Sequence, residues 1–374
     1  MSHIQILADR IQAARDAYYN KHPIMSDAEY DALEDELRQL DPSHALLAQV
    51  GAPVGGAWPK VKHHIPMGSL NKAQVEADMK DWHQGCGSNP PALAVMDNLD
   101  GASIALVYRN RALVQAITRG DGSTGEDITR NVKLMKGALK MLPPVMNGSP
   151  TPTEVHVRGE IVCLRSDFET HFKGESNPRN TAAGTAKRQS GHEKCAYLTV
   201  IAYQCMPNGV GMDTKALELR TLQDMGFRTP RWELVASMGE VLATYQDYIT
   251  RTRQSLNYDI DGLVIEVDDL HRRESLGELN GRPKGAIAFK FPHEVKPTAL
   301  IDVEWQVGNS GRLTPVAIFA PVNLGGRLVE RASLATVRQV EHLKLYKGCT
   351  IMVSLRNDVI PRVESNLSEG VEND

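Results

Sequence analysis

Two short segments rich in glycine and aspartate constrain the fold of this chain more than any other feature of its sequence. The first, residues 95–101, ends in an Asp-Gly pair and lies between the β-prone runs 93–95 and 104–108. An Asp-Gly pair between two such runs predicts a β-hairpin. The second, residues 118–127, reads Thr-Arg-Gly-Asp-Gly-Ser-Thr-Gly-Glu-Asp and predicts a glycine-rich loop.

Composition narrows the class of protein. A chain of 374 residues predicts two or three domains, and its 41% apolar and 24% charged residues are typical of a globular protein. A net charge of −4 argues against binding nucleic acid over the whole surface, although it allows a local basic face. No apolar run approaches the ~20 residues that span a bilayer, and no secretory signal is visible. We therefore expect a cytoplasmic protein without a membrane partner.

The five cysteines are scattered along the chain, at Cys86, Cys163, Cys195, Cys205 and Cys349. An odd, scattered set fits reduced thiols better than a disulfide framework. Because no Cys-x-x-Cys pair occurs, we expect no structural zinc site.

The first 41 residues follow a helical pattern. Ser26 and Glu29 match a capping box. Apolar residues then recur at helical spacing, at Tyr30, Leu33, Leu37 and Leu40. The pattern predicts two helices that end before Asp41, which alone indicates a small helical hairpin packed on its neighbour.

The middle of the chain alternates strands with interspersed helices, which predicts an α+β unit rather than regular βαβ repeats. After a Gly/Pro-rich linker at 51–59 we expect a helix over 72–83. The expected strands are 102–108, 113–118, 155–163, 198–203, 262–267 and 286–291.

The last part, residues 297–363, is β-rich. About five short strands with one helix near 334–345 predict an OB-type barrel. Residues 364–374 are acidic, and we expect them to be a disordered tail.

Several sequence blocks occur in an order that resembles the NAD-dependent DNA ligases of bacteria and phages. These blocks are residues 98–101, 118–127, 158–160, 177–188 and 288–292. Taken singly, each block is consistent with an ordinary loop or a surface charge. In this order, across nearly the whole chain to Val363, chance is a poor explanation.

The resemblance implies an α+β fold with three parts and a tail. These are a helical module for the nicotinamide mononucleotide half of NAD at 1–60, a nucleotidyltransferase (ATP-grasp-like ligase) core of antiparallel sheets at 61–293, an OB-fold barrel at 297–363 and the tail at 364–374. It also implies NAD or AMP as cofactor, with Mg²⁺.

The resemblance assigns roles to individual residues. Asp100 closes the signature turn, and Lys290 binds phosphate. Glu160 holds a ribose or a metal-bound water, and Tyr203 stacks on adenine. The remaining nucleotide contacts that it implies are Ser69, Leu70, Arg119, Arg179 and Arg188 in the core and Tyr19, Asp27, Tyr30 and Asp31 in the helical module.

The sequence departs from the family pattern at the positions that carry chemistry. Asn98 stands where the family has its nucleophilic lysine, and an amide nitrogen has no comparable lone pair, so the first step is lost. Glu266 stands at a lysine position, where an anion would repel phosphate by roughly 4 kcal/mol at 4 Å, unless it is a solvated strand residue. The other departures are Asn20, Met96 and Asn309.

Three hypotheses follow. In the first, the chain is a degenerate ligase that forms no lysyl-AMP yet keeps a partial NAD or AMP pocket. In the second, it is an active nick-sealing ligase whose lysine has been replaced in this sequence. In the third, it is a non-catalytic module that binds DNA ends, nicks or a protein partner. The family's zinc module, helix-hairpin-helix repeats and BRCT domain do not follow Val363. We therefore expect a compact form, or one subunit of a split enzyme, in the cytoplasm of a bacterial or phage-infected cell.

Nicked double-stranded DNA and a second ligase subunit are the expected partners. Five cations of the barrel suit a duplex backbone, namely Arg312, Arg327, Arg331, Arg338 and Lys347. A purely structural barrel accounts for them equally well.

Overall fold

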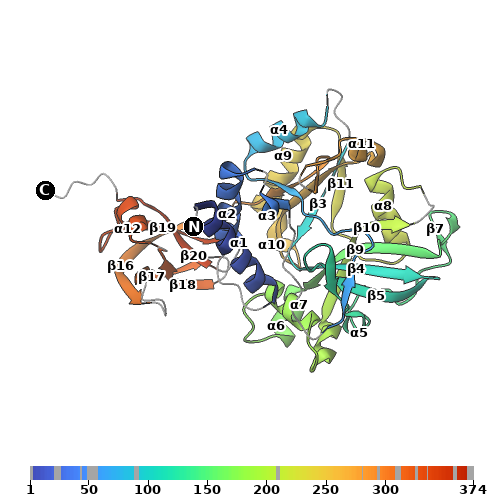
Figure 1. Ribbon diagram of the computed structural model, residues 1–374, viewed down its shortest axis with the longest axis horizontal. Helices are drawn as coiled ribbons and strands as arrows, with labels where there is room; N and C mark the ends of the chain where they lie inside the picture. The colour runs from blue at the N-terminus through green and yellow to red at the C-terminus, as the bar shows by residue number, and fades with distance from the viewer. Residues whose placement is uncertain are drawn as a thin grey trace. The chain divides into compact units, whose positions relative to one another are not determined.

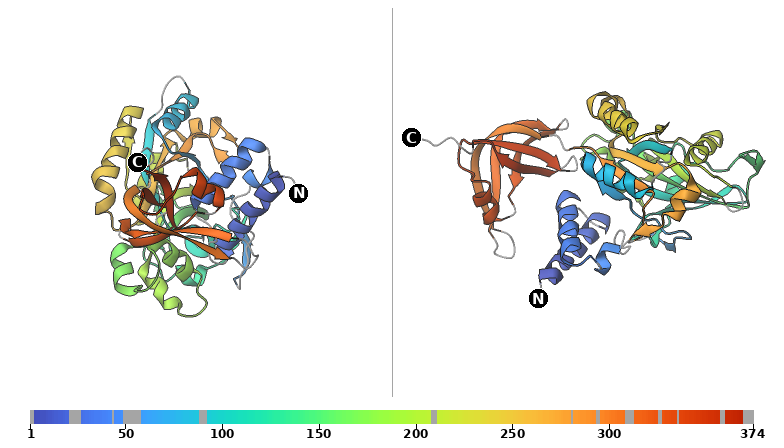
Figure 2. Two further views of the ribbon diagram at one scale, coloured as in Figure 1. Left: turned by 90° about the vertical axis from the view of Figure 1, so that its left-hand side faces the viewer. Right: turned by 90° about the horizontal axis from the view of Figure 1, so that it is seen from above.

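The computed structural model forms two compact units (Figures 1 and 2). One contains residues 1–14, 23–40 and 292–374, and the other contains residues 15–22 and 41–291. The structure describes residues 3–20, 27–42, 44–48, 58–87, 92–207, 211–279, 281–292, 295–307, 313–324, 327–334, 336–356 and 360–368.

The N-terminal residues form the two predicted helices, α1 (His3–Asn20) and α2 (Asp27–Leu40), followed by the short α3 (Ala45–Ala48). Leu33 and Leu37 are buried as their spacing predicts, whereas Leu40 at the helix end is 48% exposed. The predicted capping box involves Ser26, which lies outside the described residues. None of the described helices has the length and apolarity needed to cross a membrane.

The larger unit is built on two sheets. One has the strand order β11 (Trp232–Val235), β3 (Leu93–Leu99), β12 (Ile260–Val267), β15 (Ala286–Lys290) and β2 (Asn71–Ala73). The other has the order β10 (Leu198–Pro207), β9 (Glu154–Cys163), β4 (Ala102–Arg109) and β5 (Ala112–Thr118). All six predicted strands are present, and every pairing is antiparallel except that of β15 with β2.

Residue alternation gives the five-stranded sheet two different faces. Leu93 and Val95 of β3 point into an apolar cluster that includes Met79 of α4 (Glu76–Gly85) and Val241 of α9 (Met238–Asp247). Figure 1 shows these two helices side by side over the sheet. The other face carries Met96 and the chemical groups described below.

The helix predicted over 72–83 begins later than expected. Lys72 and Ala73 belong to β2, because Ala73 is buried and pairs with Phe289 of β15. Asp78 then accepts hydrogen bonds from the backbone N–H groups of Gln74 and Val75, at 2.8 and 3.1 Å, which starts the helix.

The hairpin predicted at residues 100–101 is wrong. β3 and β4 belong to different sheets, so the Asp-Gly turn carries the chain from one sheet to the other. The Asp100 N–H donates to the carbonyl of Asp259 at 3.0 Å. Gly101 lies directly on β9, where an added Cβ would be 2.3 Å from the Ile161 carbonyl oxygen. Glycine is therefore required by close backbone approach.

Helices cover the apolar face of the four-stranded sheet. Ala182 of α7 (Pro178–Ala186) and Leu219 of α8 (Lys215–Asp224) share a core with Leu106 and Val157. The other elements of this unit are β1 (Lys60–Lys62), β6 (Thr124–Glu126), α5 (Thr129–Val132), β7 (Val145–Met146), β8 (Ser149–Pro150), α6 (Arg165–His171), η1 (His192–Tyr197), η2 (Tyr248–Thr252), α10 (Arg253–Ser255), α11 (Leu270–Ser275), β13 (Glu278–Leu279) and β14 (Arg282–Pro283).

The C-terminal part is the predicted OB-type barrel. Its strands follow the order β18 (Arg327–Ser333), β17 (Leu313–Leu324), β16 (Val295–Val307), β19 (Thr350–Arg356) and β20 (Ile360–Asn366), with β18 and β20 in contact. The one predicted helix is α12 (Val337–His342). The prediction of a disordered tail from residue 364 is wrong at its start, because Glu364 lies in β20 and accepts a hydrogen bond from Ser354. Residues 369–374 lie outside the described residues.

Candidate nucleotide site

Asn98 lies in a row of paired residues that crosses three strands of the five-stranded sheet. Asn98 pairs with Gly262, and Gly262 pairs with Lys290 on the next strand. Directly opposite residues of antiparallel strands share a face. Glu266 is on that face too, four residues along β12 from Gly262. The structure therefore puts Asn98, Glu266 and Lys290 on one surface of the sheet.

The turn that follows Asn98 carries a partly buried cluster of charges. Arg179 of α7 pairs with Asp100, with 3.1 Å between Nη1 and Oδ1. Glu160 of β9 is buried and hydrogen-bonds Ser103, which lies opposite it on β4. Burial raises the pKa of Glu160 to about 8, although Ser103, Arg179 and Arg119 act in the opposite direction.

Arg119 is held at the start of the glycine-rich loop. Its Nη2 donates to Ser69 Oγ at 2.7 Å, which ties the loop to the segment 63–70. His63 reinforces this link, since its Nε2 lies 3.0 and 3.1 Å from the carbonyls of Thr118 and Arg119. The Arg119 Nε is buried and has no hydrogen-bond partner among the described residues. A buried donor without a partner suits an acceptor on a ligand.

Tyr203 occupies an irregular position in β10. The register of β10 against β9 shifts between Ala202 and Gln204, so Tyr203 is the extra residue of a β-bulge. Burial raises the pKa of its hydroxyl, and it experiences the charges of Glu160 and Glu266. Tyr203 therefore lies near one acidic residue from each sheet.

Lys290 is ion-paired with Asp261. Asp261 Oδ1 is buried and has no hydrogen-bond partner in the part of the chain that the structure describes. Gly262, next to Asp261, allows β12 and β15 to lie close together at this point, because a Cβ at residue 262 would be 2.3 Å from the Phe289 carbonyl oxygen.

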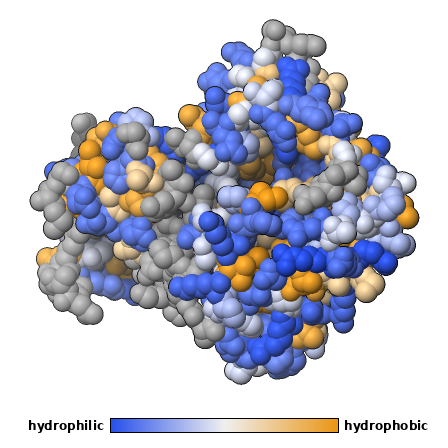
Figure 3. Space-filling model, turned by 45° about the vertical axis from the view of Figure 1, so that its right-hand side comes forward, coloured by the Kyte–Doolittle hydropathy of each residue, from blue (hydrophilic) through white to orange (hydrophobic). Residues whose placement is uncertain are grey.

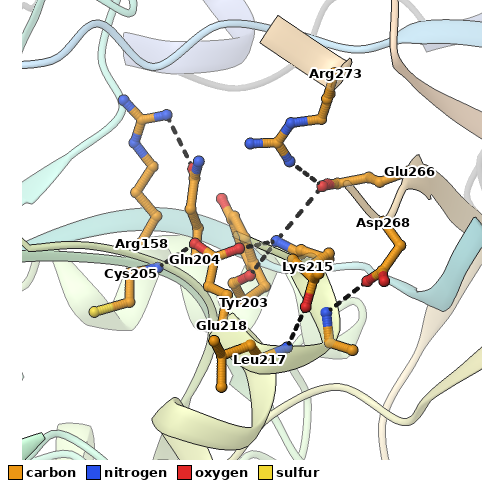
Figure 4. Close-up of polar contacts among 12 residues, drawn as sticks. Arg158, Tyr203, Gln204, Cys205, Lys215, Leu217, Glu218, Glu266, Asp268 and Arg273 are labelled. Carbon is orange, nitrogen blue, oxygen red and sulfur yellow. Dashed lines mark hydrogen bonds and ion pairs between the residues drawn. The ribbon is translucent and has the colours of Figure 1, made fainter. Parts of the chain in front are cut away.

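Glu266 is the centre of a buried ion-pair network (Figure 4). Its Oε2 contacts Arg273 Nη1 and lies 3.6 Å from Lys215 Nζ. Lys215 is only 1% exposed, and it also donates to Glu218 Oε2 at 2.9 Å and to the Tyr203 carbonyl at 2.7 Å. Burial by itself raises the pKa of Glu266, but attraction to Lys215 and Arg273 outweighs it and lowers the pKa.

This network changes two expectations about Glu266. The residue is not a solvated strand residue, because it is 9% exposed and paired. Nor is it an isolated anion that repels phosphate, because Lys215 and Arg273 balance the charges of Glu266 and Glu218. The two cations and two anions of this network balance one another, because an unpaired charge in a low-dielectric region would be costly.

Several predicted site residues lie elsewhere or cannot be placed. Arg188 pairs with Glu175 at 3.0 Å, and Leu70 packs against the apolar core. Tyr30 donates to Glu34 Oε1 at 2.6 Å within α2. Tyr19, Asp27 and Asp31 lie in α1 and α2, and their side chains are outside the described part of the structure, as are Asn20 and Asn309. Met96 is buried in the core.

Four residues of the site, Ser103, Lys215, Glu218 and Arg273, escaped the sequence analysis. Ser103 follows Gly101 by two residues, and alternation along a strand could have placed it opposite Glu160. Lys215 and Glu218, three residues apart at the start of α8, form a visible helical ion pair. No sequence signal connects Lys215 or Arg273 with Glu266, because only the tertiary fold brings them together.

Two paired sheets with this cluster, joined in one chain to an OB barrel, define a nucleotidyltransferase fold. Family models agree over most of the chain. The NAD-dependent DNA ligase adenylation domain matches residues 56–294, the OB-fold domain of the same ligases matches 297–374, and the N-terminal NAD⁺-binding domain of DNA ligase-like proteins matches 1–54. The chain belongs to the NAD-dependent DNA ligase family.

Curated relatives agree with this assignment. The chain is 42% identical to a DNA ligase of Sorangium cellulosum, over 96% of this chain and 56% of that protein. It is 36% identical to a DNA ligase of Treponema denticola and 37% identical to one of Acidiphilium cryptum, over 96% and 97% of this chain. The chain thus spans about 56% and 55% of the length of those two relatives.

Proposed function

We propose that this chain is a degenerate NAD-dependent ligase that binds NAD or AMP without forming a covalent bond to AMP. One observation carries the proposal. Asn98 and Lys290 lie in the same row of paired residues across the sheet. Asp100, Arg179, Glu160 and Arg119 lie around the turn that follows Asn98. The groups that recognise a nucleotide are present, and the nucleophile is not.

The residues present fit an adenine nucleotide. The partnerless Arg119 Nε would donate to a phosphate or ribose oxygen, and the partnerless Asp261 Oδ1 would accept from a ligand donor. Lys290 would contribute a further cation for phosphate. Glu160, protonated over much of the neutral range, would donate to a ribose hydroxyl as well as accept from it.

Neighbouring lysines do not replace the missing amine. The ammonium group of Lys290 is paired with Asp261, and that of Lys215 is paired with Glu218 and lies near Glu266. An ammonium ion has no lone pair with which to attack a phosphate. In the described part of the chain, the site therefore offers binding groups and no free nucleophile.

The relatives are named DNA ligases, and we extend the proposal to nicked duplex DNA as the macromolecular partner. Arg338 and Lys347 are exposed cations of the barrel that suit phosphate contacts. Arg331 is already paired with Glu304 at 2.7 Å. Arg312 and the side chain of Arg327 lie outside the described residues.

The test combines calorimetry with intact-protein mass spectrometry. The unmodified chain is titrated with NAD and with AMP, and then incubated with NAD and Mg²⁺. Asn98→Lys is run beside it, and Asn98→Met serves as a control that has similar length but no amine. Glu266 is left unchanged, because a lysine there would meet Lys215 and Arg273.

We expect the unmodified chain and Asn98→Met to bind AMP or NAD and to gain no mass. Asn98→Lys should gain the mass of one AMP, which would show that only the nucleophile is missing. Absence of heat with all three proteins would contradict the nucleotide site and favour the DNA-binding module. A mass gain by the unmodified chain would contradict the proposed loss of covalent chemistry.

A further inference from the structure

A second cluster of titratable side chains lies at the far end of β9 from the candidate nucleotide site. His64, Glu154 and His156 offer three ligand atoms that all lie within 4.8 Å of one another. We infer that these residues form a binding site for a divalent transition-metal ion such as Zn²⁺. The site is independent of the proposed nucleotide binding.

The distances suit one small ion. His156 Nε2 lies 2.8 Å from Glu154 Oε1, and His64 Nε2 lies 3.5 Å from the same oxygen. Ligands about 2.0–2.1 Å from a tetrahedral zinc ion are about 3.3 Å from one another. The observed separations lie on either side of this value. The two imidazole rings are tilted by 55°, with 5.5 Å between centroids, so they are not stacked on each other.

The fold holds two of the three ligands rigidly. Glu154 and His156 are two residues apart on β9 and therefore share a face of the sheet. His64 reaches them from the segment 63–70. This segment is anchored nearby, because Arg158 Nη2 donates to the carbonyls of Ile65 and Pro66 at 3.0 and 2.7 Å.

Glu154 is already oriented to offer one oxygen. Its Oε2 accepts from Nε of Arg109, which lies opposite it on β4, at 2.9 Å. Such a hydrogen bond to the second carboxylate oxygen is typical of metal-binding carboxylates.

The ligand chemistry selects the kind of ion. Two imidazole nitrogens and one carboxylate oxygen favour Zn²⁺, Co²⁺ or Ni²⁺ over Mg²⁺ and Ca²⁺, which prefer oxygen. The His64 side chain is 69% exposed, so water can enter and complete the coordination. The expectation of no zinc was drawn from the missing cysteine pairs and concerns a closed structural site, whereas this site is open and exchangeable.

The same contacts also describe a hydrogen-bonded cluster without metal, and zinc affinity separates the two. A metal site binds Zn²⁺ and loses affinity when His64 or Glu154 is replaced, whereas a cluster that only forms hydrogen bonds has no such affinity to lose.

The test is calorimetric titration of the full chain with ZnSO₄ in a buffer without chelators at neutral pH. His64→Ala removes one exposed ligand and should leave folding intact, which circular dichroism checks. His342→Ala, at an exposed position of α12, is the matched control. Glu154→Gln is a second variant that keeps the shape of the side chain.

We expect one zinc ion per chain, with affinity at least about tenfold weaker in His64→Ala and Glu154→Gln and unchanged in His342→Ala. Zinc should also raise the melting temperature of the unmodified chain more than that of His64→Ala. Equal affinity of the unmodified chain and His64→Ala, or no binding by the unmodified chain, would overturn the inference.

Discussion

The charge of Glu266 depends on two cations from neighbouring helices, one distant in sequence and one seven residues away. Lys215 begins α8 and Arg273 lies in α11, and both reach the carboxylate in a region closed to solvent. A buried anion of this kind is tolerated only while its cations stay in place. Glu266 therefore has a structural role whether or not a nucleotide binds.

We predict that Lys215→Met and Glu266→Lys each lower the free energy of unfolding by about 3–5 kcal/mol, because each leaves buried charges unpaired. Chemical denaturation at pH 7 measures the loss. Lys80→Met is the control, since Lys80 pairs with Glu76 on the surface of α4 at 2.8 Å, with side chains 58% and 55% exposed. It should cost less than about 1 kcal/mol. A similar cost for Lys80→Met and Lys215→Met would contradict this account.

Glu160 should make stability depend on pH. Its folded-state pKa, about 8, is above the ordinary value of 4.5, so between these values the folded chain keeps a proton that the unfolded chain releases. The contribution of Glu160 to the free energy of unfolding is fully present below about pH 4.5 and is lost as the pH rises through about 8. Between pH 5 and pH 8 the unmodified chain should lose roughly 2–4 kcal/mol more than Glu160→Gln.

Denaturant unfolding at the two pH values checks this prediction. Glu169→Gln, at an exposed position of α6, should follow the unmodified chain. Equal pH dependence of the unmodified chain and Glu160→Gln would show that burial does not hold a proton on Glu160.

At the residue scale, sequence motifs predict which side chains belong to the site better than they predict which residues those side chains contact. Asp100, Arg119, Glu160 and Lys290 stand in recognisable blocks, and the structure places each of them near the row of Asn98 or beside the turn that follows it. The partners of Glu266 were not predictable, because a buried ion pair between α8 and β12 has no local sequence signature. From the sequence alone, the charge of Glu266 was therefore expected to repel phosphate.

At the scale of elements, the turn after β3 determines how the two sheets meet. Gly101 lies against the backbone of β9, and no side chain fits there. Gly184 in α7 is the opposite case, because a Cβ added there would have no neighbour within 4 Å.

We predict that Gly101→Ala lowers the free energy of unfolding by about 1–3 kcal/mol or more, since the backbone must move to admit the methyl group. Gly184→Ala should raise it by about 0.5–1 kcal/mol, because alanine is the better residue inside a helix. Thermal and denaturant unfolding compare the two. Equal effects of the two substitutions would refute the close-packing argument.

The same turn shows what alternation and turn residues can and cannot predict. They located the strands on both sides of residues 100–101 correctly, because each strand is a continuous apolar, β-prone run that is buried over most of its length. They assigned the wrong partner, because pairing was decided by contacts of β3 with β11 and β12 much later in the chain. The start of α4 was misplaced for a similar reason, since β2 pairs with the distant β15.

At the scale of the molecule, hydrophilic residues dominate the face shown in Figure 3, with apolar residues in small scattered groups. In the proposed binding of nicked DNA, affinity should rest on phosphate contacts by exposed cations, and its logarithm should fall linearly with the logarithm of salt concentration. Charge reversal of two exposed barrel cations, Arg338→Glu with Lys347→Glu, should reduce the slope by about 2.

Fluorescence anisotropy with a nicked duplex at several salt concentrations measures this slope. Lys80→Glu with Lys140→Glu, two exposed cations of the larger unit, gives the matched control. An unchanged slope for the barrel variant would assign DNA binding to other residues, and a slope near zero for the unmodified chain would contradict DNA binding itself.

The position of β3 in its sheet also has a kinetic consequence. Leu99 ends β3, yet its neighbours β11 and β12 are not complete until Val235 and Val267, so during synthesis both edges of this strand stay unpaired until β11 has been made. At about 5–20 residues per second, that interval is on the order of ten seconds. Contacts of such long sequence separation also slow refolding. The strand that carries Asn98 is thus exposed in the nascent chain to premature edge-to-edge association.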